Sequence, residues 1–434
     1  MRVLSGDLSK QIGKTVHMEG WLHKKRLLGG LTFINLRDRQ GVIQAVIKDK
    51  SEVEKLKGMQ VGSVLNIDGL VVEESRAPKG VELHDVKVEV VVAVTQEPPI
   101  EIDKPLSHKP DNLDTLFEHR SIGLRNQYES KIFLIRAALI KLIREFLDGQ
   151  DFVEINSPKI VGNAAEGGAE VFKLDYFGKQ ASLAQSPQLY KQVMVGVFER
   201  VFEIGPAFRA EPSATTRHVS EVTMLDIEMA FVQNHEEVLN MVQDLLYDVI
   251  SKVWELYPEI LKELSAPEPV LQPKFPRYSM KQIHQMYQEA NKVDMSNEID
   301  LTPDEERWIC DYAKDHDHCE AVFATDLPRA KMKFYHMAKD EESAASADLL
   351  FRGLELATVP LREHRYEQLL KQMQVAGINV DDPNYQFYLQ AFRHGLPPHG
   401  GCGFGIDRLV EKTLGLANIK EAILFPRDIN RLAP

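Results

Sequence analysis

Three arginines stand among small or polar residues in two short segments of the sequence, a combination that suits a phosphorylated ligand. "FRAEPSATTRH" contains Arg209 and Arg217, and "GGCGFGIDR" ends on Arg408. Guanidinium groups bind phosphate oxygens bidentately and stay charged at any working pH. Glycines let the backbone approach a nucleotide, and a helix N-terminus favours phosphate. A single arginine is simply a surface residue near a turn, but the three together predict a triphosphate site.

Acidic residues supply the other half of such a site. Asp348 and Glu355 lie seven residues apart in a segment that reads as strand, and Thr358 follows three residues later. Carboxylates and a hydroxyl beside ATP phosphates are typical of bound Mg²⁺, which prefers oxygen ligands. The alternative interpretation is an exposed acidic strand edge. Beside the arginines, these residues favour ATP with Mg²⁺.

The elements that would position these residues fall into two domains. Residues 1–98 contain five short strand-like runs with a short helix after the third, which predicts an OB-fold β-barrel, although any small β-barrel fits the same pattern. Residues 99–125 are rich in proline and charge, and we expect a hinge or linker there.

Residues 126–434 have a different pattern, with two long helices and several closely spaced strands. Ile132, Ile135, Leu139 and Ile143 recur at helical spacing, and a second helix is expected from Asn234, with Glu237 as its capping-box partner. Closely spaced strands favour an antiparallel sheet flanked by helices, and hence an α+β domain. Residues 265–345 carry helical charge runs and are interpreted as an insertion.

Composition narrows the class of protein. The 434-residue chain has a net charge of −13, which argues against nucleic-acid binding through bulk positive charge but allows a few placed contacts. Three cysteines cannot build a disulfide framework, so reduced thiols are expected. The first residues lack the apolar core of a signal peptide, and no apolar run approaches the roughly 20 residues that span a membrane. We therefore expect a cytoplasmic protein with no membrane contact.

Several segments resemble the class II aminoacyl-tRNA synthetases, over nearly the whole chain. "EFLDGQDFVEINSPKI", "FRAEPSATTRHVSEVTMLDIEMAF" and "GGCGFGIDRL" are similar to motifs 1, 2 and 3 of that class. "AQSPQLYKQ" resembles the amino-acid pocket of archaeal-like aspartyl-tRNA synthetases, in which its lysine marks aspartate rather than asparagine. The resemblance implies a homodimer formed through motif 1, and aspartyl transfer to tRNA through an aspartyl-adenylate.

The resemblance also assigns roles to single residues. Lys191 and Arg362 would pair with the aspartate side chain, and Glu170 would hold the amino group. Arg209 would bind the α-phosphate, and Arg408 would lie over the adenine. The implied catalytic residues are Arg209, Glu355 and Arg408. The implied aspartate site is Glu170, Gln188, Lys191, Arg209, Thr358 and Arg362. The implied ATP site is Arg209, Glu211, Arg217, His218, Val219, Glu355, Gly405, Ile406, Asp407 and Arg408. The implied Mg²⁺ ligands are Asp348, Glu355 and Thr358.

In the N-terminal barrel the resemblance implies an anticodon site. Phe33 would stack on an anticodon base, Gln44 would read the edge of that base, and Glu82 matches a third anticodon contact. Stacking with edge hydrogen bonds is how single-stranded RNA is recognised. For Phe33 by itself, a place in the barrel core is an equally good interpretation. His23 and Pro78 resemble the residues of bacterial second-type enzymes that charge both tRNA-Asp and tRNA-Asn. Misaspartylated tRNA-Asn would then pass to a tRNA-dependent amidotransferase.

One segment departs from the family pattern. The family has Ser-Ser-Gly-Gly-Gln-Arg where this chain has "ATVPLR", Ala357 to Arg362. Val359 and Pro360 are expected to fill the space that two glycines leave open, and the proline removes an N–H donor. Val222 and Ala347 also stand where aromatic rings are common.

Three hypotheses follow from the pattern and its departures. The first is an aspartyl-tRNA synthetase that charges both tRNAs. The second is a paralogue that activates aspartate or a related acid for a role outside translation. The third is an RNA-binding or regulatory protein with an inactive synthetase core, against which the retained arginines and Glu355 argue.

Overall fold

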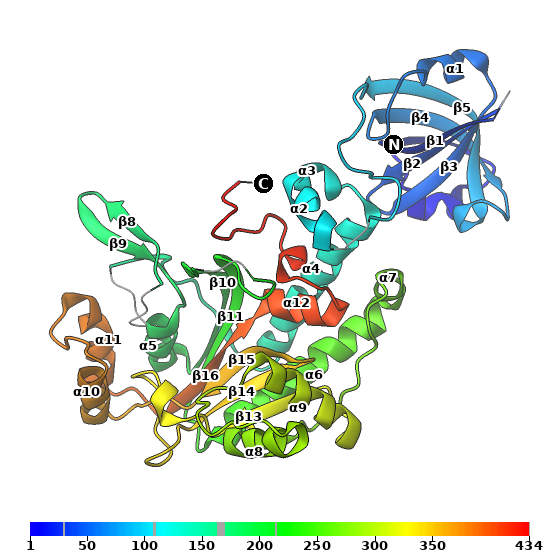
Figure 1. Ribbon diagram of the computed structural model, residues 1–434. Coiled ribbons are helices and arrows are strands. Elements are labelled where there is room, and N and C mark those ends of the chain that lie inside the picture. Colours follow the sequence, from blue (N-terminus) through cyan, green and yellow to red (C-terminus); the bar gives the residue numbers. More distant parts are fainter. Residues whose placement is uncertain (29–30, 107–109, 163–169, 213–214, 434) are drawn as a thin grey trace. The chain divides into compact units, whose positions relative to one another are not determined.

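A computed structural model describes residues 1–28, 31–106, 110–162, 170–212 and 215–433 (Figure 1). The chain forms two compact units, residues 1–130 and residues 131–433. Within the described residues, no helix combines the length and the apolar character that crossing a membrane would require.

The first unit is a closed five-stranded barrel with the strand order β1-β2-β3-β5-β4. Its elements are the 3₁₀ helix η1 (Ser5–Gln11), β1 (Thr15–Leu28), β2 (Leu31–Asp38), β3 (Gly41–Ile47), α1 (Lys50–Lys55), β4 (Val64–Glu73), η2 (Pro78–Gly80) and β5 (Val81–Val92). Thr32, Ile34 and Leu36 point into the barrel, because alternate residues of a strand face opposite sides. The helix after the third strand and the closed order confirm the predicted OB-fold.

The segment expected to be a hinge or linker, 99–125, includes two helices of the first unit. These are α2 (Pro110–Glu118) and α3 (Arg120–Gly123). Leu113, Leu116 and Phe117 of α2 are buried, with Ile100 and Leu106 packed against them. Apolar packing therefore gives part of this proline-rich segment a fold of its own, which composition did not indicate.

The second unit is built on an eight-stranded sheet with the order β12-β13-β14-β15-β16-β11-β10-β6. Its strands are β6 (Val153–Glu154), β10 (Arg200–Phe208), β11 (Glu221–Ala230), β12 (Arg277–Ser279), β13 (Ala321–Thr325), β14 (Ser346–Phe351), β15 (Leu354–Pro360) and β16 (His399–Gly405). Neighbours from β13 to β10 pair antiparallel, and only the edge strands β12 and β6 pair in parallel. The α+β prediction is confirmed.

Two long helices follow the predicted apolar spacing. Helix α4 (Gln127–Asp148) buries Ile132, Ile135, Leu139 and Ile143, and α6 (His235–Leu256) lies along the sheet in Figure 1. The Asn234 side chain accepts from the Glu237 backbone N–H at 3.2 Å, as expected of an N-cap. The capping box is incomplete, however, because the Glu237 carboxylate accepts from the backbone N–H of Gln233 instead.

Two other segments differ from their sequence interpretation. Two of the closely spaced strands expected in one sheet do not join it, because β8 (Lys173–Tyr176) and β9 (Lys179–Leu183) form a separate three-stranded sheet with β7 (Ile160–Val161). The segment interpreted as an insertion supplies β12 and β13 of the main sheet. The remaining helices are α5 (Gln188–Phe198), α7 (Pro258–Glu263), α8 (Met280–Asn291), α9 (Pro303–His316), η3 (Arg329–Lys331), α10 (Tyr366–Val375), α11 (Pro383–Arg393), α12 (Ile406–Leu414) and η4 (Ile419–Ala422).

Candidate functional site

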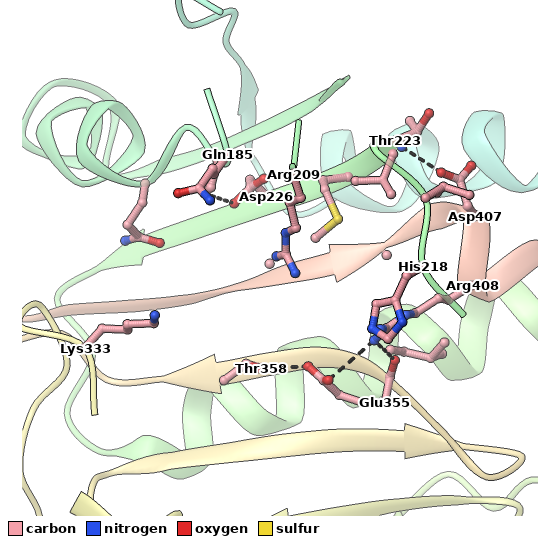
Figure 2. A pocket seen from close by; sticks show the side chains of 18 of the residues that line it. Gln185, Arg209, His218, Thr223, Asp226, Lys333, Glu355, Thr358, Asp407 and Arg408 are labelled. Atoms are coloured by element: carbon pink, nitrogen blue, oxygen red, sulfur yellow. Dashed lines mark hydrogen bonds and ion pairs between the residues drawn. The ribbon is translucent and has the colours of Figure 1, made fainter. Parts of the chain in front are cut away.

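A pocket lies across the middle strands of the eight-stranded sheet. Asp226 of β11 pairs in register with Gly403 of β16, which pairs in turn with Thr358 of β15, and all three line the pocket. The empty volume is about 1120 Å³, including space open to solvent. The side chains of the pocket gather between these strands in Figure 2. The sheet therefore brings motif 2, motif 3 and the "ATVPLR" segment, which are far apart in the chain, to one surface.

A glycine of β16 permits the close approach of this strand to β11. A Cβ atom on Gly401 would lie 1.9 Å from the backbone oxygen of Ile227 on the neighbouring strand. No side chain fits at that distance, so this position of "GGCGFG" requires glycine. The glycine-rich strand leads directly into a helix, since α12 begins immediately after β16.

One end of the pocket gathers the predicted phosphate-binding arginines. Arg209, Arg217, His218 and Arg408 all line it, together with Glu211 and Val219. Arg217 pairs with Glu306 of α9 at 2.7 Å, and Arg408 donates to the backbone oxygen of Glu355 at 2.7 Å. The Arg209 side chain has no hydrogen bond or ion pair with the residues that the structure describes. A guanidinium without a partner beside two anchored ones suits a polyanionic ligand.

The sequence suggested that Asp348 and Glu355 lie on one strand. In the structure they lie on two adjacent strands, β14 and β15. The turn between β14 and β15 consists of Arg352 (φ 50°) and Gly353 (φ 74°), both in the left-handed region that a two-residue hairpin favours. The hairpin places Asp348 opposite Thr358, whose hydroxyl donates to Glu355 at 3.0 Å. The predicted acid cluster therefore forms across strands.

The pKa values of the two carboxyl groups are shifted in opposite directions. Burial and the neighbouring Glu355 charge raise the pKa of Asp348 to about 8. Burial opposes ionisation of Glu355 as well, but the charges of Arg408 and Arg209 and the hydrogen bond from Thr358 together outweigh it and lower the pKa of that carboxyl. Asp348 Oδ1 and Ser346 Oγ are buried and have no hydrogen-bond partner among the described residues. Two adjacent carboxylates with an unsatisfied oxygen are a donor set that fits a divalent cation.

The opposite end of the pocket is closed by a buried network of charges. Lys191 donates to Asp226 at 2.9 Å and to the backbone oxygen of Cys402 at 2.8 Å. Arg362 donates two hydrogen bonds to Glu228, at 3.0 and 3.1 Å. Burial would raise the pKa of Glu228, but the charges of Arg362 and Lys191 outweigh it and lower the pKa. Both cations predicted to meet the aspartate side chain therefore already have internal partners.

The "TVPLR" departure alters the pocket less than the sequence suggested. Thr358 and Pro360 line the pocket, whereas the fully buried Val359 lies on the other face of the strand. His235 of α6 bonds the Val359 backbone oxygen at 2.6 Å. Val359 therefore does not fill the pocket, contrary to the expectation, and only the proline ring lies at its wall.

Some of the remaining predicted site residues lie elsewhere. Ile406 is fully buried and does not line the pocket. Asp407 lines it, but its carboxylate is held by Arg136 and by the backbone N–H of Thr223. The Glu170 side chain does not line the described pocket, although its backbone oxygen accepts from Gln185 and Ala210, each at 3.0 Å. Gln188 does line the pocket and bonds Gln192 at 3.0 Å.

Other pocket residues were not predicted from the sequence. They include Gln185, Ser186, Met224, Asp226, Lys333, Tyr335 and His336. The strand alternation of "VTMLDIEMAF" was a usable signal for Met224 and Asp226, because every second residue faces one side. Nothing in the sequence pattern marked Lys333, Tyr335 and His336.

The outer face of the barrel carries the predicted anticodon residues. Phe33 is half-buried and lies on the opposite side of β2 from the core residues, so the barrel-core interpretation is wrong. Gln44 of β3 donates to the Glu82 carboxylate of β5 at 2.7 Å, and His84 bonds the other oxygen at 2.7 Å. These side chains form one face across three strands. The half-buried Phe33 ring and Gln44 are the members that single-stranded RNA could reach, whereas Glu82 is buried and holds Gln44 and His84 in place.

His23 and Pro78, the two residues expected to influence the choice between tRNA-Asp and tRNA-Asn, lie where the regular strand structure is interrupted. His23 occupies a β-bulge, because the β1–β2 register shifts between Leu22 and Lys24. A bulge re-aims the side chain of its extra residue. Burial, with a smaller effect of the Arg37 charge, lowers the pKa of His23. Pro78 is the first residue of η2, and the structure describes its backbone but not its side chain.

Comparison with protein families gives two matches. Residues 112–429 match the family of tRNA synthetases class II (D, K and N), and residues 16–92 match an OB-fold nucleic acid binding domain. A relative from Thermus thermophilus, named aspartate–tRNA(Asp/Asn) ligase, is 39% identical over the full length of both chains. An aspartate–tRNA(Asp) ligase from Pyrococcus furiosus is 37% identical and is aligned over 99% of each chain.

Solved structures give the same architecture. Asparaginyl-tRNA synthetase from Pyrococcus horikoshii, bound to asparaginyl-adenylate, superposes with a TM-score of 0.91 at 30% identity over the full length of both chains. Aspartyl-tRNA synthetase from Entamoeba histolytica superposes with a TM-score of 0.87 at 29% identity, covering all of this chain and 93% of the other.

Proposed function

Because the chain belongs to the class II tRNA synthetases of the D, K and N group, we propose that it joins L-aspartate to tRNA at the expense of ATP. The observation that carries the proposal is the match, over the whole length of the chain, to relatives named as aspartate–tRNA ligases. The pocket agrees with this, because Arg209 has no ion pair with the described residues at the place where an amino acid with two carboxylates must meet a triphosphate.

The proposed reaction begins with in-line attack of the aspartate α-carboxylate on the α-phosphorus of ATP, which forms aspartyl-adenylate and releases pyrophosphate. No protein nucleophile is needed, so positioning and charge neutralisation do the catalytic work. Arg209 has a free guanidinium and would stabilise the charge that develops on the α-phosphate. The anchored Arg217 and Arg408 would hold the rest of the nucleotide. A hydroxyl of the terminal ribose of tRNA would then attack the aspartyl carbonyl, forming the ester and releasing AMP.

Asp348 and Glu355, with the Thr358 hydroxyl, would hold the Mg²⁺ that accompanies ATP. The unsatisfied Asp348 oxygen supports this assignment, as does the effect of Glu355 and burial, which raise the pKa of Asp348 to about 8. Both features describe an Asp348 carboxyl whose negative charge is not balanced by its surroundings. When bound, the cation neutralises phosphate charge.

We propose that the barrel face of Phe33, Gln44 and Glu82 binds the anticodon and that both tRNA-Asp and tRNA-Asn are charged. His23 at its bulge supports this, and so does the Asp/Asn specificity named for the Thermus relative. The homodimer, the amidotransferase partner and the cytoplasmic location remain predictions.

ATP–pyrophosphate exchange with the purified protein tests the proposal, each amino acid being supplied in turn. L-Aspartate should drive exchange, and L-asparagine should drive little. Charging of tRNA-Asp and tRNA-Asn transcripts should then proceed at comparable rates. Exchange with another amino acid, or with none, would overturn the assignment.

A further inference from the structure

Arg217 lines the pocket that lies across the sheet (the main pocket), but its anchor comes from helix α9, behind that pocket. Its Nη1 donates to the Glu306 carboxylate at 2.7 Å, and its Nη2 donates to the backbone oxygen of Gly353 at 3.3 Å. The side chains of Arg217 and Glu306 are 23% and 14% exposed. A long arginine side chain loses much rotational freedom when it is fixed. These two contacts therefore determine where the guanidinium lies.

Glu306 belongs to a helical turn that is itself held firmly. Thr302 and Glu305 form a capping box at the start of α9, in which each backbone N–H is bonded by the other side chain, at 2.8 and 3.3 Å. His284 of α8 bonds the Glu305 carboxylate at 2.6 Å. Helix α9 also packs against β13, β14 and β15 (Figure 1). The carboxylate of Glu306 therefore starts from a fixed backbone.

The same turn of α9 touches the hairpin that carries the acidic pair. Gly353, in the turn of that hairpin, has φ 74°, and a Cβ atom there would lie 2.8 Å from Cγ and 3.1 Å from Cα of Arg307. Both the backbone conformation and the close approach require glycine. Arg217, the start of α9 and the turn between β14 and β15 thus meet at one point. This junction sets the spacing between Arg217 and the carboxylates of Asp348 and Glu355.

Glu306 lies behind Arg217 and does not line the main pocket. It lines a second, neighbouring pocket together with Lys331, Asp348 and Glu355. Burial and the charge of Glu355 raise the pKa of Glu306, while the hydrogen bond and charge of Arg217 act in the opposite direction. A guanidinium has five N–H donors. The contacts to Glu306 and to the backbone of Gly353 use two of them, so three remain for a ligand in the main pocket.

We propose that Glu306 is a positioning residue, which holds the Arg217 guanidinium where the phosphates of ATP bind and does not contact the nucleotide itself. The inference rests on the proposed function, because it takes ATP as the ligand of the arginines. Without Glu306, the guanidinium would lose a charge-assisted bond, and Glu355 would become an alternative partner. An Arg217 that turned to Glu355 would compete with the cation proposed for that carboxylate. ATP binding should therefore weaken, although a negative charge has been removed.

The test is a double-variant cycle on ATP binding, with Glu306→Ala, Arg217→Ala and the protein that carries both changes. The dissociation constant of ATP is measured by titration calorimetry, with excess Mg²⁺ and no amino acid. Glu306→Ala should raise this constant by about 10- to 100-fold, the value of a hydrogen bond to a charged group. The double variant should bind ATP no more weakly than Arg217→Ala alone, because Glu306 acts only through Arg217. In ATP–pyrophosphate exchange, the KM for aspartate should not change.

Two further variants separate positioning from a general effect on the fold. Asp304 belongs to the same helical turn, pairs with Arg307 at the surface and has a side chain that is 69% exposed, so Asp304→Ala should bind ATP as the parent protein does. Glu306→Gln keeps an oxygen that can accept from Arg217, and it should weaken ATP binding by a smaller factor than Glu306→Ala. If Glu306→Ala does not fold, Glu306→Gln takes its place in the cycle.

Two results would overturn the role of Glu306. One is unchanged or tighter ATP binding in Glu306→Ala, and the other is a double variant in which the two losses add. A parent protein that binds ATP but gives no exchange with aspartate would overturn the proposed function alone, so the two failures are distinguishable.

Discussion

Ala347 and Val359 stand directly opposite each other across β14 and β15, and both are fully buried. Their neighbours Asp348 and Thr358 face the pockets, so this pair faces the other side of the sheet. The sequence presents both residues as departures from the family pattern, in a region expected to bind ligand. The structure shows them as a single packing pair, in which a small residue makes room for a larger one.

We expect this pair to behave non-additively. Val359→Gly should lower the free energy of unfolding by about 2–3 kcal/mol through the lost side chain and added backbone freedom. Ala347→Phe should cost about 1–3 kcal/mol by overpacking. The double variant should recover at least about 1 kcal/mol of the summed loss, measured by denaturant unfolding of all four proteins. Strict additivity would show that the two side chains do not share one space.

Lys191 should be essential for stability as well as for activity. Replacing it with leucine leaves one cation, Arg362, for the two buried carboxylates of Asp226 and Glu228. We expect the free energy of unfolding to fall by about 3–5 kcal/mol. A double variant that also carries Asp226→Asn restores the charge balance. It should regain much of the stability, while aspartate-dependent exchange stays low. If the single variant kept the melting temperature of the parent protein, the internal pairing would carry no energy.

Phe33 should matter for tRNA and not for amino-acid activation. Phe33→Ala removes a stacking surface worth about 1–3 kcal/mol per base, so the KM for tRNA should rise between about fivefold and a hundredfold. ATP–pyrophosphate exchange, which needs no tRNA, should not change. Phe33→Tyr, which keeps the ring, is the matched control. A comparable loss of exchange activity in Phe33→Ala would place the effect on folding and not on RNA binding.

His23 should influence the choice between the two tRNAs. The bulge aims this side chain separately from its neighbours, so a larger ring there is expected to act locally. His23→Trp should reduce charging of tRNA-Asn more than charging of tRNA-Asp, in parallel assays with both transcripts. An equal loss with the two substrates would contradict a role in discrimination.

The stability of the protein should depend on pH because of His399. The imidazole is buried, bonded to Gln192 at 2.9 Å and to the Pro397 backbone oxygen at 2.8 Å, and burial lowers its pKa to about 4. Because the unfolded chain takes up this proton more readily, the stabilising contribution is complete above pH about 6.5 and is lost as pH falls toward 4.

The size of the His399 effect follows from the same shift and amounts to at most about 3 kcal/mol. Melting temperatures between pH 4.5 and 7 should therefore rise with pH, and His399→Gln should flatten that slope. A variant with the slope of the parent protein would assign the pH dependence to other groups.

The sequence predicted the parts of the fold that local patterns determine. Alternating apolar residues and turn signals specify the barrel, and the spacing of Ile132, Ile135 and Leu139 specifies α4. The arginines of the motifs line the pocket as expected. Such features follow from residue types and their periodicity, because a strand or an amphipathic helix needs only its own sequence to present one apolar face.

What only the tertiary structure decided is the pairing between distant residues. Glu355 and Asp348 were predicted as ligands on one strand, but the hairpin places them on two. Lys191 and Arg362 were predicted to be free for a ligand, but Asp226 and Glu228 reach them from β11. Glu306 carries no motif, and only folding brings it to Arg217. Charge balance in a buried site depends on distances across the sheet, which residue types and spacing along one chain do not contain.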